Sequence, residues 1–330
     1  MSAPSVSPSS TVRASARDRR LAEISVAVVV VMWSANFVIV KAAVETIGPL
    51  TFTAARYTVA AVTLFLLVAW RFGLVRPPTQ VVLTLMGLGV LGFGVYQVLW
   101  SVGLTQITAG DSAMIIAISP VITALLAGAV GMDRLTAPKL VGALVAFAGV
   151  AIVIAGGHEL ALGASLVGDL MTLGAAVLWA VYTVCATRML RRIDPLQVSA
   201  WAVLGGALFL LPLGIWEVAT GGIDGAGAGA AGIAAGLTLG VVLAILYSGA
   251  LAAGIANVLV FNAIRLIGPT RVTVSQFLVP FGAVLLGALL LHEPVGLAQL
   301  AGGAVIVLGV WLTRRRSVLP SALRERIGAA

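Results

Sequence analysis

Charged residues are scarce in this chain: Asp, Glu, Lys and Arg make up 10% of its 330 residues. A soluble domain carries about 25%. Apolar residues account for 60%, and the mean hydropathy is +1.12. Because so little polar surface cannot coat a globule in water, the composition predicts a polytopic protein of the lipid bilayer. The formal charge of +8 does not indicate a nucleic-acid partner, since the basic residues are dispersed.

Cysteine and histidine are nearly absent, which limits the chemistry. The single Cys185 lies in an apolar run, so it is expected to pack as a small apolar side chain. His158 and His292 fall in predicted loops and form no metal-spaced pair. Membrane-embedded enzymes need clustered His, Asp or Cys, so we expect no enzyme, no metal and no cofactor. The chain also lacks a Walker motif, which argues against ATP coupling.

A similar pattern occurs twice in the chain. In the later part of each half, matching residues are separated by the same number of positions as Pro120 and Pro280. In the earlier part, the separation is smaller and equals that between Trp33 and Trp179. The two offsets are reconciled by one insertion at the Gly/Ala-rich run from Gly221 to Gly232. Duplicated membrane domains are typical of secondary transporters, whose substrate site lies at the repeat interface. Further matches are Glu23 with Asp169, Pro49 with Pro195, Trp70 with Trp216, Gly94 with Gly254, Asp133 with Glu293, Gly142 with Gly302, and Gly149 with Gly309.

Apolar windows long enough to cross a bilayer predict an all-α fold. We expect two five-helix repeats, at residues 21–156 and 166–313, flanked by a disordered tail at 1–20 and a basic tail at 314–330. The ten predicted spans are 23–43, 50–70, 79–103, 108–130, 138–156, 166–187, 196–218, 236–262, 269–291 and 297–313.

The basic residues predict the orientation. With the N-terminus in the cytoplasm, the external loops contain no Lys or Arg, and their charges are confined to Glu159, Asp224 and Glu293. This asymmetry indicates a multi-pass protein of a bacterial cytoplasmic membrane with both termini inside. Because five spans per repeat is an odd number, the second repeat must be inverted. The cytoplasmic segments hold Arg13, Arg17, Arg19, Arg20, Arg71, Arg76, Arg134, Lys139, Arg188, Arg191, Arg192, Arg265, Arg271, Arg314, Arg315, Arg316, Arg324 and Arg326.

Several short motifs resemble those of the EamA family in the drug/metabolite transporter superfamily. The run Trp33-Ser-Ala-Asn36-Phe37 ending at Lys41 is similar to the family's first helix, and Pro49, Phe52 and Arg56-Tyr57 to its second. The segments Gly103 to Pro120 and Gln276 to Pro294 resemble the fourth helix and its counterpart. The resemblance covers residues 20–315 and implies a ten-helix transporter of small metabolites. Two departures are Asp133, where the family usually has Glu, and the absence of an Asn36 equivalent after Trp179.

Two basic residues within or near spans are the first candidates for substrate binding. A charge inside a bilayer is costly and functional by default. Arg56 lies about two turns into the second helix, and Lys41 near the outer end of the first. Both could bind a carboxylate, which a guanidinium holds through two parallel hydrogen bonds. Alternatively, Lys41 pairs with Glu45 at i,i+4, and Arg56 extends to the headgroups.

A second set of polar and aromatic residues is predicted to line the pathway. Trp33 and Asn36 share one side of the first helix, although an amide there could also bond only a neighbouring helix. Aromatic rings could stack a flat substrate or sit in interfacial belts. This set comprises Trp33, Asn36, Tyr96, Gln97, Trp100, Trp179, Tyr182, Asn257, Asn262, Ser275 and Gln276.

Pro120 and Pro280 lie at the centres of the fourth and ninth spans, where each frees the carbonyl four residues earlier. They are predicted hinges, with a static packing kink as the alternative. Asp111 is expected to complement the dipole at a helix start, although a proton-carrying role stays open. Asp133 and Glu293 belong either to gates or to loops.

The sequence therefore predicts a secondary transporter of small metabolites working by alternating access. The basic pair Lys41 and Arg56 favours efflux of amino acids or related zwitterionic and anionic compounds. Alternatives are a multidrug or purine/nucleoside exporter of the same superfamily and, remotely, a membrane-embedded enzyme. The expected partners are a small-molecule substrate and the bilayer; proton coupling is a hypothesis, and the oligomeric state is not predicted.

Overall fold

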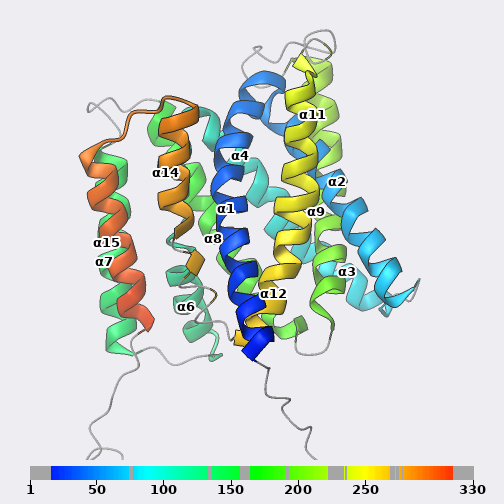
Figure 1. Cartoon of the computed structure of the whole chain (residues 1–330), viewed down its shortest axis with the longest axis horizontal. Coiled ribbons are helices and arrows are strands. Elements are labelled where there is room, and N and C mark those ends of the chain that lie inside the picture. Colours follow the sequence, from blue (N-terminus) through cyan, green and yellow to red (C-terminus); the bar gives the residue numbers. More distant parts are fainter. Residues whose placement is uncertain are drawn as a thin grey trace, which may run out of the picture.

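The computed structural model describes residues 16–314, except 74–76, 133–135, 157–163, 191–192, 222–233, 235, 268–271, 273–274 and 277. These residues form a bundle of helices, and no strand occurs among them (Figure 1). The all-α prediction is confirmed.

Each predicted repeat supplies a series of helices. The first contains α1 (Ala16–Ile47), α2 (Pro49–Phe72), α3 (Thr79–Gly89), the π-helix η1 (Val90–Val95), α4 (Tyr96–Gln106), α5 (Ala109–Ile116), α6 (Ser119–Ala129) and α7 (Ala137–Gly156). The second contains α8 (Ala164–Leu190), α9 (Pro195–Thr220), α11 (Leu239–Leu246), the π-helix η2 (Tyr247–Ile255), α12 (Ala256–Ile267), α14 (Leu278–Leu290) and α15 (Leu297–Arg314).

Eight described helical segments are long and apolar enough to cross a membrane. Two shorter apolar helices, Leu278–Leu290 and Leu297–Leu312, lie where the last two spans were predicted. The polytopic prediction therefore holds, while the count of ten spans stays a prediction. One boundary differs: α1 begins at Ala16, so residues 16–20 are helical and not part of a disordered tail. Asp18 in the first turn of α1 stabilises that start.

Equivalent helices of the two repeats pack against each other in opposite directions. Arg71 at the end of α2 lies 3.9 Å from Asp194 at the start of α9, while Glu217 near the end of α9 reaches Thr51 at the start of α2. The two ends of this pair can meet in this way only if α2 and α9 are antiparallel. The second repeat is therefore inverted relative to the first.

The pair α7 and α15 shows the same relation through glycine. A Cβ added to Gly149 would lie 2.6 Å from the Ile306 backbone nitrogen, and one added to Gly309 would lie 2.6 Å from the Gly142 carbonyl oxygen. Glycine at these positions lets the two helix backbones approach closely.

The first helix of each repeat packs against the other repeat. Helix α1 packs on α12 and α14 of the second repeat, and α8 packs on α4 and α6 of the first. Each repeat therefore completes the core of the other. Apolar clusters follow these contacts, including one in which Ala22 and Val26 of α1 meet Ala256 and Ala263 of α12.

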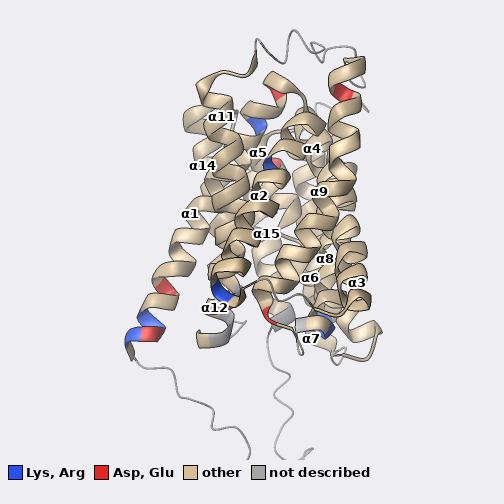
Figure 2. Cartoon of the chain, turned by 90° about the vertical axis from the view of Figure 1, so that its right-hand side faces the viewer, with Lys and Arg blue, Asp and Glu red and all other residues tan. Residues whose placement is uncertain are grey.

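The start of α1 and the end of α15 lie at the same end of the bundle (Figure 1). We call this the terminal end, and the opposite end, with the α1–α2 turn and the α14–α15 loop, the distal end. Most described charged residues lie near these two ends, and the middle of the bundle is almost uncharged (Figure 2). This distribution fits a membrane-spanning protein.

Candidate substrate site

Both repeats carry a π-helix at the same place in their third span. Segment η1 covers Val90–Val95 and η2 covers Tyr247–Ile255, and the repeat offset equates Gly94 with Gly254. Short π-helical segments inside α-helices are often found at functional sites. In η2, a Cβ at Gly249 would collide with the Arg56 carbonyl oxygen and lie 2.8 Å from Val59. Glycine thus brings η2 directly against the backbone of α2.

Arg56 is buried at this contact, with 2% of its surface exposed. One terminal nitrogen donates to Ser248 Oγ at 2.8 Å, and the other donates to the side-chain oxygen of Gln97. Its Nε has no hydrogen-bond partner. Among the described residues no carboxylate pairs with it. Arg56 does not extend to the headgroups, so that alternative is wrong.

The hydrogen bonds of Arg56 continue into both repeats. Ser248 donates onward to Asn36 Oδ1 on α1 at 2.7 Å, and the amide nitrogen of Gln97 donates to the Tyr57 hydroxyl at 2.7 Å. We call these five residues the central network. It links α1, α2 and α4 of the first repeat to η2 of the second. A change at Arg56 therefore alters hydrogen bonds in both repeats.

Aromatic rings surround the guanidinium. The Arg56 Cζ lies 5.0 Å from the Tyr57 ring centroid, 5.2 Å from that of Trp100 and 5.8 Å from that of Phe52. These distances are typical of cation–π contacts, which strengthen when the cation is desolvated. Trp100 is fixed by a hydrogen bond from its indole nitrogen to Ser112 Oγ at 3.0 Å. The aromatic groups therefore offset part of the cost of burying the charge.

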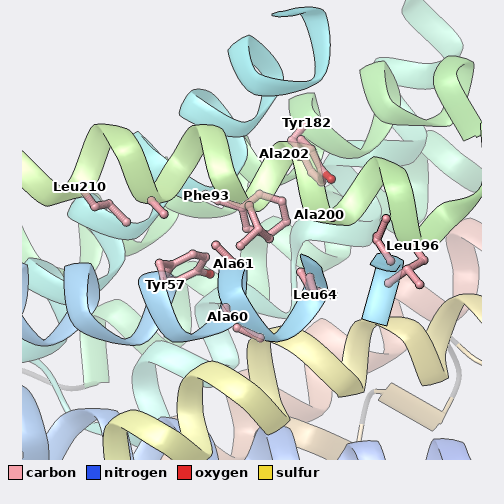
Figure 3. Close-up of a cluster of buried hydrophobic side chains, with 14 of the residues drawn as sticks. Tyr57, Ala60, Ala61, Leu64, Phe93, Tyr182, Leu196, Ala200, Ala202 and Leu210 are labelled. Carbon is pink, nitrogen blue, oxygen red and sulfur yellow. The ribbon is translucent and has the colours of Figure 1, made fainter. Parts of the chain in front are cut away.

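A second aromatic group extends from Tyr57 toward α8. Phe93 of η1 lies 5.9 Å from Tyr57 and 4.9 Å from Tyr182, and Trp179 lies 5.5 Å from both Tyr182 and Tyr96. Figure 3 shows Tyr57, Phe93 and Tyr182 converging from three elements. Of the predicted pathway residues, Trp100 therefore lies against the Arg56 guanidinium, whereas Tyr96, Trp179 and Tyr182 belong to the aromatic group that extends away from Tyr57.

Trp33 and Lys41 are held by backbone groups. The Trp33 indole nitrogen donates to the Ala252 carbonyl of η2 at 3.0 Å, which ties α1 to the π-helix. Lys41 Nζ pairs with Glu45 at 2.9 Å and donates to the Leu104 carbonyl at 2.9 Å. A cation at the last carbonyls of α4 stabilises that helix end. The i,i+4 pairing considered for Lys41 is therefore present, and Lys41 lies outside the central network.

Asn257 and Gln276 are not brought into this group by any described contact. The Asn257 amide nitrogen donates to the carbonyl of Ala253, four residues earlier in η2, the segment that α12 continues. Gln276 is half-buried in a short helical stretch before α14.

The fourth span is interrupted at Pro120, as its sequence suggests. Helix α5 ends at Ile116, and α6 begins at Ser119 with Pro120 in its first turn. The Ile116 carbonyl, which Pro120 leaves without its usual donor, accepts from Ser119 Oγ at 2.7 Å. Pro280 is the third residue of α14, and the residue before this helix, 277, is not described. The break at Pro120 is observed, whereas a hinge motion at either proline stays a prediction.

Asp111 lies in the first turn of α5, where the sequence placed it. Its backbone nitrogen donates to Thr108 Oγ1 at 3.0 Å, and its Oδ2 accepts from the same hydroxyl at 2.8 Å. Asp133, predicted to belong to a gate or a loop, falls outside the described residues. No group of three or more His, Cys, Asp and Glu is close enough to hold a metal in the part of the chain that the structure describes.

Three residues that form contacts between the helices were not predicted from the sequence: Ser248, Phe93 and Glu217. Ser248 is a rare hydroxyl in a long apolar run, and Gly249 follows it directly. This pair was the available signal, because a small polar residue beside glycine in a span marks a close polar contact between helices. Nothing in the sequence indicates the π-helical geometry.

Two inverted helical repeats with a polar group shared across their interface, inside a membrane bundle, define the architecture of a secondary transporter. The EamA-like transporter family matches the chain twice, over residues 20–155 and 166–315. The protein therefore belongs to the EamA-like transporter family.

Named relatives agree with this assignment. A "Probable terminal-alkyne amino-acid exporter" of Streptantibioticus cattleyicolor is 30% identical over 290 residues, covering 88% of this chain and 92% of the relative. An "Uncharacterized transporter" of Archaeoglobus fulgidus is 27% identical over 87% of this chain and 95% of its own length. The "Uncharacterized transporter YvbV" of Bacillus subtilis is 26% identical over 88% of this chain and 90% of its own length. A solved crystal structure matches with a TM-score of 0.60 over 93% of this chain and 99% of its own, and at 19% identity this likeness concerns the fold alone.

Proposed function

We propose that the protein exports amino acids or related carboxylate-bearing metabolites by alternating access, and that Arg56 binds the substrate carboxylate. The observation that carries this proposal is the buried guanidinium, which is bonded to neutral groups and keeps Nε unpaired. A buried cation is costly until an anion joins it. An incoming carboxylate would therefore gain a charge-assisted bidentate contact.

The position of Arg56 supports a transport role. Because Ser248 belongs to the second repeat and Arg56 to the first, a carboxylate that displaces Ser248 changes the contact between the repeats. Substrate binding and the relative movement of the repeats would then be linked at one residue. The name of the Streptantibioticus relative, an amino-acid exporter, agrees with such a substrate.

The wider setting of the proposal follows from charge. We place the terminal end in the cytoplasm of a bacterial cell, because the sequence concentrates Lys and Arg there. The chain performs transport and no catalysis in this proposal.

A panel of labelled substrates tests the proposal. Membrane vesicles with and without the protein are loaded with labelled leucine, phenylalanine, glutamate and adenine, and efflux is followed. We expect efflux of at least one amino acid and none of adenine. Adenine efflux alone would instead support the purine alternative, which the ring group of Tyr96, Trp179 and Tyr182 favours.

Substitution of Arg56 tests the site itself. Arg56→Gln should lower amino-acid efflux about tenfold or more, because a charge-assisted contact is lost. Arg56→Lys should retain part of it. Arg71→Gln is the matched control, since Arg71 is exposed at the terminal end and only loosely paired. Unimpaired efflux in Arg56→Gln, with normal amounts of protein in the membrane, would remove Arg56 from the site.

A further inference from the structure

The loop between α14 and α15 reaches across to the other repeat at the distal end. The Glu293 carboxylate accepts from the Ala109 backbone nitrogen at 2.8 and 3.1 Å, and from that of Gly110 at 3.5 Å. These N–H groups begin α5, where they have no partner within the helix. A carboxylate of the second repeat therefore caps a helix of the first.

A second contact lies in the same first turn of α5. Gln299 of α15 is buried and donates from its amide nitrogen to Asp111 Oδ1 at 2.9 Å and more weakly to Thr108 Oγ1 at 3.5 Å. The two contacts share α5 on one side and the α14–α15 segment on the other. We call this set of Ala109, Asp111, Glu293 and Gln299 the distal latch.

The packing around Glu293 is close and specific. A Cβ added to Gly287 of α14 would lie 2.5 Å from Glu293 Oε2, so glycine makes room for the carboxylate. His292 holds the preceding backbone at φ 55°, a conformation that few side chains adopt. Strained backbone beside a fitted carboxylate indicates a position that the surrounding structure enforces.

The equivalent residues at the terminal end cannot form the same contacts. The repeat offset that pairs Pro120 with Pro280 equates Ala109 with Pro269, which has no N–H to donate. It equates Asp111 with Arg271, Gln299 with Lys139 and Glu293 with Asp133, so the loop carboxylate is kept while the amide–carboxylate pair is replaced by two cations. The helix cap from a backbone N–H and the Gln299–Asp111 hydrogen bond therefore cannot recur in the same form at the other end.

We propose that the distal latch holds the distal end closed in the resting transporter, so that substrate enters from the end where the chain termini lie. The entry of substrate from the terminal end rests on the proposed alternating access. With the termini in the cytoplasm, the resting site then faces the cytoplasm, so substrate binds there first and is released on the other side when the latch opens.

Cysteine accessibility at the two ends tests the proposal. In a Cys185→Ser background, Ala109→Cys reports on the distal end and keeps the backbone N–H, while Ala263→Cys reports on the terminal end; both side chains are buried. A membrane-impermeant maleimide is applied from either side of oriented vesicles. Glu293→Ala should raise labelling of the distal reporter about tenfold and lower that of the terminal reporter, because one charge-assisted cap is lost.

Two further variants keep the test decisive. Glu293→Gln retains an oxygen acceptor and should leave labelling within about twofold of the parent. Gln299→Leu, which removes only the second contact, should raise distal labelling about threefold and serves if Glu293→Ala does not accumulate. Glu45→Ala is the control, since Glu45 is an exposed carboxylate at the same end that does not join the repeats.

The outcomes separate the two proposals. Unchanged distal labelling in Glu293→Ala and in Gln299→Leu would overturn the latch, as would a parallel rise at both reporters, which indicates a loosened bundle. Opposite changes at the two reporters in a protein that moves no amino acid would support the latch and reject the proposed function.

Discussion

The distal and terminal ends of the bundle are built from equivalent segments of the two repeats, but different contacts hold the segments together at each end. At the distal end, Glu217 accepts from the Thr51 nitrogen at 2.6 Å and from its hydroxyl at 2.7 Å, and Glu293 caps α5. At the terminal end, the residue equivalent to Glu217 is Arg71, which lies 3.9 Å from Asp194 with nearly half of its side chain exposed.

The difference shows how an inverted repeat can be symmetric in its fold and asymmetric in its energetics. Carboxylates suit helix N-termini, and the distal end contains the N-termini of α2 and α5. At the terminal end, the described cation Arg71 forms a long, exposed pair with Asp194, and such pairs contribute little to stability. We therefore expect α2 and α9 to separate more easily at the terminal end than at the distal end.

The largest expected effect concerns the interface that both ends share. Gly149→Val should destabilise the protein strongly, because its Cβ would lie 2.6 Å from the Ile306 nitrogen and 2.8 Å from the Gly302 carbonyl oxygen, on backbone that cannot yield. Overpacking of this kind costs about 1–3 kcal/mol or more. We expect loss of folded protein in detergent thermal-shift measurements. Gly87→Val is the control, since nothing lies within 4 Å of its added Cβ; equal losses in both variants would contradict the close packing.

Much of this architecture is available from the sequence. The residue matches and the charge asymmetry predict two inverted repeats, because both signals can be read along the sequence. The chemistry of the interface is less accessible. Lys41 and Arg56 look alike as basic residues in or near spans, yet Lys41 caps α4 and Arg56 is buried in the central network.

The different environments of Lys41 and Arg56 depend on residues far away in the sequence. The partner Ser248 is 192 residues from Arg56, and the Glu293 cap is 184 residues from Ala109. Neither contact follows from helical periodicity. The π-helices η1 and η2, which carry Phe93 and Ser248, have no sequence signal of their own. Glu217 lies on α9, and its contact with Thr51 joins residues 166 positions apart, so helical periodicity does not predict it either.

The next largest effect compares the two ends directly. Glu217→Ala should destabilise the protein by about 2 kcal/mol, because Thr51 loses a buried cap at the start of α2. Arg71→Ala, at the equivalent position of the terminal end, should cost about 0.5 kcal/mol or less, since the pair is long and exposed. Thermal unfolding of both variants measures the contrast. Equal costs would show that the two ends are held with similar strength.

The smallest effect is the pH dependence of the distal latch. Burial raises the pKa of Glu293 above its ordinary value of 4.5, and repulsion from Asp111 adds to this, while the hydrogen bonds from Ala109 and Gly110 and the charge of Lys41 oppose it. Glu45 is paired with Lys41, and His292 adjoins Glu293 in the loop. A water-exposed Glu293 in the open state would have its ordinary pKa, so closing the latch takes up a proton.

The sign of the pH effect follows from that uptake. The proton-linked stabilisation of the closed state is fully present below about pH 4.5 and is lost as the pH rises through the raised pKa. Maleimide reacts with the thiolate, so labelling of any cysteine falls on acidification, and Glu293→Gln at the same pH is the reference. Relative to that reference, acidifying the distal side should lower labelling of Ala109→Cys by about two- to threefold, a modest change because the carboxylate is half-exposed and screened. A ratio of the two labelling rates that stays constant with pH would remove Glu293 from the pH dependence of the latch.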